Sequence, residues 1–116
     1  MLNEMIDSYI ETMIWSSVDE NGENLDDYLD ANDIALDVLN QIREDCREFY
    51  YANAQLFRIA NLTDEQIGHN FWLTRNRHGA GFWDLGLGEL GIDLTKAAHT
   101  YGECDPQVID NVIVSL

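Results

Sequence analysis

Basic residues, proline and cysteine are all scarce in this chain. Six Lys and Arg residues stand against 22 Asp and Glu residues, which gives the 116-residue chain a formal net charge of -16. A surface this negative repels phosphates, so we expect no direct binding to nucleic acid or to an anionic membrane. The two cysteines, Cys46 and Cys104, are too few for a disulfide framework and lack metal-ligand spacing, so we expect free thiols.

Long apolar runs and a basic leader are also missing. No stretch reaches the ~18 apolar residues of a membrane span, and Glu4 and Asp7 stand where a signal peptide would carry basic residues. We therefore expect a cytoplasmic protein. With 46% hydrophobic residues the chain can bury a core, and its length fits one acidic globular domain over residues 1–116.

Apolar residues recur every three to four positions along most of the chain, the period of an amphipathic helix. This pattern predicts helices over residues 2–16, 34–57, 63–78 and 87–101, the second capped by Asn32 or Asp33 and the third by a Thr63–Gln66 capping box. Two β-branched runs around Asp110 can form a short hairpin at the C-terminus. We expect a mainly α fold, with about four helices around one core and this hairpin as an α+β addition.

The acidic residues are concentrated in the first part of the chain. Residues 1–45 hold 13 acids and one base, Arg43, and so carry -12 of the total -16. A solvated helix face explains a single acidic stripe, but it explains less well why acids gather in one half. Asp33, Asp37, Glu44 and Glu48 are expected on one face of the second helix, beside an acidic loop. The candidate partner-binding residues are Asp19, Glu20, Glu23, Asp26, Asp27, Asp30, Asp33, Asp37, Glu44 and Glu48.

Residues 68–88, the glycine-rich segment, combine aromatic and polar side chains at unusual density. Such a mixture suits a ligand site or a structural corner that joins two helices. We favour the corner, because no nucleophile with an adjacent base is evident. In that case Trp83 belongs to the core and Arg75 can pair with Asp84 across the glycine bend. The candidate residues of either role are Trp72, Arg75, His78, Trp83 and Asp84.

Two further patterns match known motifs only in part. Residues 86–91 spell GxGxxG but follow no buried strand, so close packing at Gly88 and Gly91 is the better interpretation. A calcium-loop template over residues 19–30 has Asn24 at the position that requires glycine. We therefore expect no metal and no cofactor.

The stretch FWLTRNRHGAGFWD at residues 71–84 resembles a family of small conserved bacteriophage proteins of unknown function. YIETMIWSS at residues 9–17, DIA at 33–35 and REDC at 43–46 extend the resemblance over nearly the whole chain. The resemblance implies a viral accessory protein that acts in the bacterial cytoplasm, and it carries over no catalytic residue. Leu85 stands where the family usually has Arg.

Three functions remain open at this point. The first is a non-enzymatic inhibitor that docks its acidic half onto a basic host protein by DNA mimicry, with a nuclease or a repair, restriction or CRISPR component as partner. The second is a small-ligand or enzymatic site in the glycine-rich segment. The third is a structural or assembly protein, including a homodimer, that uses this segment as an interface.

Overall fold

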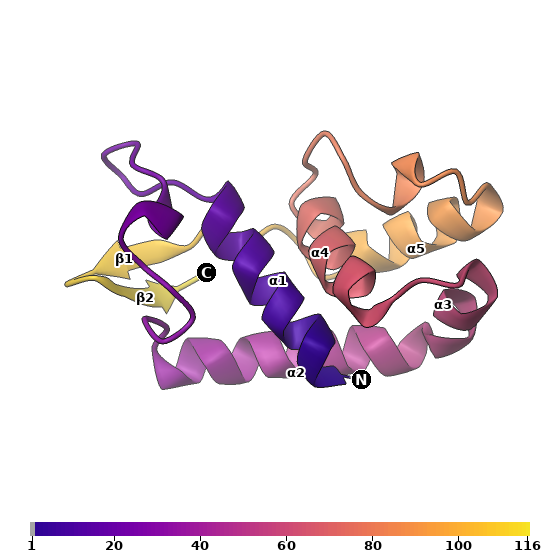
Figure 1. Ribbon diagram of the computed structural model, residues 1–116, viewed down its shortest axis with the longest axis horizontal. Coiled ribbons are helices and arrows are strands. Elements are labelled where there is room, and N and C mark those ends of the chain that lie inside the picture. The colour runs from indigo at the N-terminus through magenta and orange to yellow at the C-terminus, as the bar shows by residue number, and fades with distance from the viewer. Residues whose placement is uncertain (1) are drawn as a thin grey trace.

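The computed structural model describes residues 2–116 and has a mainly α fold with one small hairpin (Figure 1). This confirms the predicted fold class. The α-helices described are α1 (Leu2–Ser16), α2 (Leu36–Ala52), α3 (Ala54–Ala60), α4 (Asp64–Arg75) and α5 (Glu89–His99). Two 3-10 turns, η1 (Leu25–Asp27) and η2 (Phe82–Asp84), interrupt the connections, and β1 (Gln107–Ile109) and β2 (Val112–Ser115) form the hairpin.

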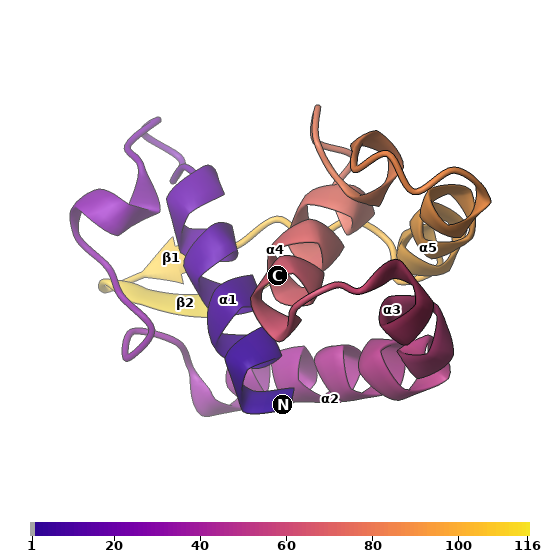
Figure 2. The same cartoon turned by 45° about the vertical axis from the view of Figure 1, so that its right-hand side comes forward.

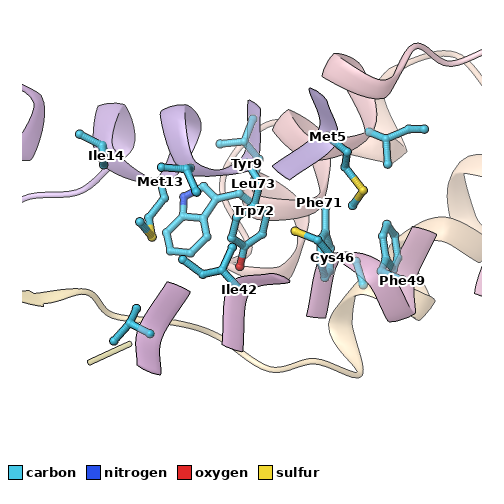
Figure 3. Close-up of a cluster of buried hydrophobic side chains, with 14 of the residues drawn as sticks. Met5, Tyr9, Met13, Ile14, Ile42, Cys46, Phe49, Phe71, Trp72 and Leu73 are labelled. Carbon is cyan, nitrogen blue, oxygen red and sulfur yellow. The ribbon is translucent and has the colours of Figure 1, made fainter. Parts of the chain in front are cut away.

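The core lies where α1 and α4 cross α2, as both whole-molecule views show (Figures 1 and 2). Phe49 of α2 stacks on Phe71 of α4 with 4.0 Å between ring centroids, and Tyr9 of α1 meets Trp72 edge-on at 5.4 Å. Cys46 is fully buried in the same cluster (Figure 3), and both cysteines are free thiols, as predicted. These aromatic contacts join the three helices into one core.

Gly68 allows α1 and α4 to approach closely. A Cβ at this position would fall on the carbonyl oxygen of Met5 and would lie 2.9 Å from the backbone nitrogen of Tyr9. Any larger side chain would therefore push the two helices apart.

The prediction of one long second helix over residues 34–57 is wrong in two details. It breaks at Asn53, which leaves the helical conformation (φ -119°, ψ 15°) and donates a hydrogen bond from its amide to the carbonyl of Phe49. It also begins at Leu36, later than expected, with Ala35 at the cap position and no side-chain cap. Asp33 does not cap it because its carbonyl accepts from Ile113 N–H and its carboxylate accepts from Asp30 N–H.

The third and fourth predicted helices form as α4 and α5. The Thr63–Gln66 capping box is present at the start of α4, which ends a little earlier than expected, at Arg75. Gly91 packs closely, since a Cβ there would lie 2.8 Å from the carbonyl oxygen of Phe82. Gly88 does not pack closely; it has a positive φ of 62° and precedes α5.

The C-terminal hairpin turns at Asp110 and Asn111. Both have positive φ, 53° and 61°, as a two-residue type I′ turn requires. The hairpin lies beside residues 17–35 at one end of the molecule, while α3, η2 and α5 form the other end (Figures 1 and 2). The described residues extend over 43 × 25 × 21 Å along their principal axes.

Candidate functional site

The acidic loop, residues 17–35, is a folded element. Leu25 and Leu29 are buried and anchor it to the core, and Leu25 N–H donates to the carbonyl of Ser17 at 3.0 Å. A bridge between Val18 and Asn24 closes its first turn. The backbone that carries the acids of the loop is thus ordered.

Asp19 holds this first turn together. One carboxylate oxygen accepts from the N–H groups of Asn21 and Glu23, and the other accepts from the Tyr28 hydroxyl at 2.7 Å. The Tyr28 hydrogen bond, with those of the backbone, lowers the pKa of Asp19 below its ordinary value, and the same bond raises the pKa of Tyr28 to about 12. Asp19 is therefore a charged structural residue of the loop.

Most of the other candidate acids face solvent. Asp33 is half-buried and accepts from Asp30 N–H. It precedes α2, so the predicted four-acid stripe on that helix is wrong at its first member. Glu44 is paired with Arg47 at 2.8 Å, which offsets its charge locally. The exposed candidates are Glu20, Glu23, Asp26, Asp27, Asp30, Asp37, Glu44 and Glu48.

A groove runs between the acidic loop and residues 103–111. It consists of three adjoining hollows of about 380, 280 and 440 Å³. The first and second share the lining residues Val18, Asp105 and Pro106, and the second and third share Asp19, Glu20 and Val108. We call this continuous hollow the acidic groove.

Carboxylates from both ends of the chain line the acidic groove. No lysine or arginine of residues 2–116 lines it, and His78 at one end is its only basic type of side chain. The acids from the C-terminal part of the chain were not among the candidates predicted from the sequence. The acids that line the groove are Asp19, Glu20, Glu23, Glu103, Asp105 and Asp110.

Arg75, a candidate from the glycine-rich segment, is a buried structural residue. Its guanidinium donates to Asp45 at 2.9 Å, to the Tyr9 hydroxyl at 3.1 Å, and to the carbonyls of Tyr101 and Gly102. Burial works to lower the pKa of Arg75, but Tyr9 and Asp45 raise it above its ordinary value. The expected pair with Asp84 is wrong: Arg75 pairs with Asp45 of α2.

The rest of the glycine-rich segment divides between the interior and the surface. Trp72 is buried and donates from its indole nitrogen to Ser16 Oγ at 2.7 Å. Trp83 is 54% exposed, so its expected place in the core is wrong. Its neighbour Phe82 takes the inward position in η2, where it is fully buried and donates its N–H to Thr74 Oγ1. This arrangement directs the side chain of Trp83 outward.

Three candidate residues of the glycine-rich segment that could have formed a ligand or enzymatic site, Arg75, His78 and Asp84, do not lie together in one site. His78 and Asp84 are exposed, and only His78 lines the groove. Asp84 accepts from Gly81 N–H at 3.1 Å within its own turn. Within residues 2–116, no group of three or more His, Cys, Asp or Glu side chains is placed to hold a metal ion.

Comparisons with known proteins give no relative: no family model, no curated protein and no solved structure matches this chain. None of the helices in residues 2–116 has the length and apolar character needed to cross a membrane.

Proposed function

We propose that this is a viral accessory protein that binds a basic, nucleic-acid-binding protein of the bacterial host and blocks its access to DNA. The observation that carries the proposal is the folded acidic loop with its exposed carboxylates. Further acids line the opposite side of the acidic groove, and no lysine or arginine of residues 2–116 lines it. Carboxylates carried on an ordered backbone can substitute for phosphates, since a partner need not order that backbone on binding.

The magnitude of the charge is compatible with mimicry of a duplex. DNA carries one charge per ~1.7 Å of axis, so a duplex as long as the 43 Å long axis of this protein carries about 25 charges. The protein carries a net -16, roughly two thirds of that. Because the buried Arg75–Asp45 pair is itself neutral, the whole of this net charge lies outside it.

A capture experiment with matched charge variants tests the proposal. Immobilised protein is exposed to bacterial lysate at low and high salt, and duplex DNA is then added as competitor. We expect captured proteins that bind DNA and are released by duplex and by salt, because exposed charge pairs are screened over ~8–10 Å.

The variant for this test neutralises Glu23→Gln, Asp26→Asn and Asp27→Asn, three exposed acids of the loop. Its control neutralises Glu65→Gln, Glu89→Gln and Asp93→Asn, three exposed acids of α4 and α5. We expect the first set to lose the captured partner and the control to keep it. Equal capture of the partner by both sets of variants at every salt concentration would refute mimicry. Lysozyme, a basic protein that is unrelated to DNA binding, serves as a second control, and its capture would show that the protein binds basic proteins in general.

A second function, assembly through an apolar interface, is favoured by one observation at the other end of the molecule. Trp83 and Leu85, in and after η2, and Ile92 of α5 are exposed on two segments that pack together. Self-association through this surface should strengthen with salt, because two copies of charge -16 repel each other. Partner binding through the acidic loop should weaken with salt, so sedimentation and capture against salt separate the two functions.

A further inference from the structure

The outer edge of β1 is open, whereas that of β2 is occupied. Ile113 of β2 donates its N–H to the carbonyl of Asp33 at 2.8 Å and accepts from Ala35 N–H at 3.0 Å. The segment at residues 33–35 thus covers β2. No strand of residues 2–116 pairs with β1 on the side away from β2.

The hairpin geometry determines which peptide group of β1 points outward. In a two-residue turn the flanking residues, here Ile109 and Val112, exchange hydrogen bonds, and the next pair along does not. Val108 and Ile113 form that next pair. The N–H and carbonyl of Val108 therefore point away from β2, just as those of Ile113 point outward to residues 33–35. In residues 2–116 neither group of Val108 has another hydrogen-bond partner.

The open edge at Val108 borders the acidic groove. Val108 lines both the second and the third hollow, and Glu20 and Asp19 of the acidic loop line the same two hollows. Val18 is 51% exposed beside it and offers apolar contact. An extended chain lying in the groove would meet backbone groups from the hairpin and carboxylates from the loop.

We propose that β1 binds an extended, lysine- or arginine-rich segment of the partner protein as an additional strand. Backbone hydrogen bonds at Val108 position the segment, and the carboxylates of the groove select basic side chains. A second copy of this chain is disfavoured as the occupant, because edge-to-edge pairing would bring two acidic loops together. This inference rests on the proposed function and names the kind of segment that the partner supplies.

The test uses the wild-type protein and a synthetic peptide that alternates lysine and valine over about ten residues, the upper end of ordinary strand lengths. Two further peptides carry N-methyl groups on the valine amides only or on the lysine amides only. In a strand, alternate N–H groups point to opposite edges, so only one methylated peptide should lose binding, by at least about tenfold in calorimetric titration. Hydrogen exchange of the Val108 amide should slow on binding of the parent peptide.

Protein variants check where the peptide lies. Glu20→Gln with Glu23→Gln should weaken binding of the parent peptide, and Glu89→Gln with Asp93→Asn on α5 should leave it unchanged. Equal binding of both methylated peptides, or unchanged exchange at Val108, would refute strand addition. Concentration-dependent dimerisation that protects Val108 without peptide would also overturn the inference, since a second copy would then be the occupant. If no peptide binds while the loop variant still loses its captured partner, the groove inference fails and the proposed function stands.

Discussion

The guanidinium of Arg75 occupies the point where α1, α2, α4 and the chain after α5 meet. Its donors are distributed over a carboxylate, a hydroxyl and two carbonyls, and it lies 5.5 Å from the ring centroid of Phe71. A buried charge is tolerated only when it is paired and hydrogen-bonded, and here each hydrogen bond also joins α4 to a separate part of the chain. Arg75 therefore acts as a structural residue of the corner.

We expect Arg75→Met to destabilise the fold by roughly 3–5 kcal/mol, because it removes the charge partner of the half-buried Asp45 and the donors to the Tyr9 hydroxyl and two carbonyls. Arg75→Lys should also destabilise, since an ammonium group cannot reproduce the planar fork of donors. Urea unfolding of both variants measures the effect, with Arg77→Met, at an exposed position, as the control. A stable Arg75→Met protein would show that the network contributes little.

The two tryptophans of the glycine-rich segment should differ in their effect on stability. Trp72 is 1% exposed, and Trp72→Ala should cost about 3–5 kcal/mol, as large aromatic truncations in a core do. Trp83→Ala removes a half-exposed side chain and should cost less than about 1 kcal/mol. Comparison of their thermal midpoints checks this, and equal losses would place Trp83 in a buried contact.

At the scale of elements, the sequence predicted correctly those helices and caps that depend on interactions between neighbouring residues. The capping box at Thr63 and the apolar period of α1, α4 and α5 are properties of neighbouring residues, and all four appear in the structure. The break at Asn53 was missed because the apolar pattern continues through it. The prediction of Asp33 as a cap was wrong because its carbonyl accepts a hydrogen bond from Ile113, a residue far along the chain.

The candidate site was predictable only in its first half. The pooling of acids before residue 45 identified the acidic loop, including Glu20 and Glu23. Asp105 and Asp110 were missed because only the hairpin, folded against the loop, brings them to the same groove. The only indication of these two acids in the sequence is their place in or beside the segment predicted to form the hairpin.

The α1–α4 contact depends on the absence of a side chain at residue 68. Gly68→Ala should destabilise by about 1–3 kcal/mol through overpacking, although alanine favours a helix over glycine by up to ~1 kcal/mol. Gly79→Ala is the control, because a Cβ there meets no atom within 4 Å. Chemical denaturation of both variants tests the contact, and a more stable Gly68→Ala protein would mean that the two helices can separate without loss.

For the molecule as a whole, we expect the free energy of unfolding to fall as the pH becomes alkaline. Burial raises the pKa of Cys46 and of Tyr9, and burial together with Glu48 raises the pKa of Tyr101 to about 12. The fold thus favours their neutral forms. Their stabilising contribution is fully present below the unfolded-state values, 9.0 for cysteine and 10.0 for tyrosine, and is lost as pH rises through the folded-state values.

We therefore expect the urea midpoint to fall progressively above about pH 9. The decline between about pH 9 and pH 10 should be shallower in Cys46→Ala, which lacks the fully buried thiol and keeps only that of Cys104, than in the wild-type protein. Tyr51→Phe, at an exposed position, serves as the control and should follow the wild-type profile. A midpoint that stays constant through this range would contradict the predicted role of burial.

The Arg75 network should also affect the rates of folding and unfolding differently. Its four hydrogen bonds join residues that are 26 to 66 positions apart in the chain. Because the entropy of closing such long loops is lost before these contacts are gained, we expect the network to form after the main barrier to folding. Loss of Arg75 should then leave the refolding rate nearly unchanged and accelerate unfolding. The buried guanidinium would in this way set the lifetime of the native state, more than the speed with which the chain reaches it.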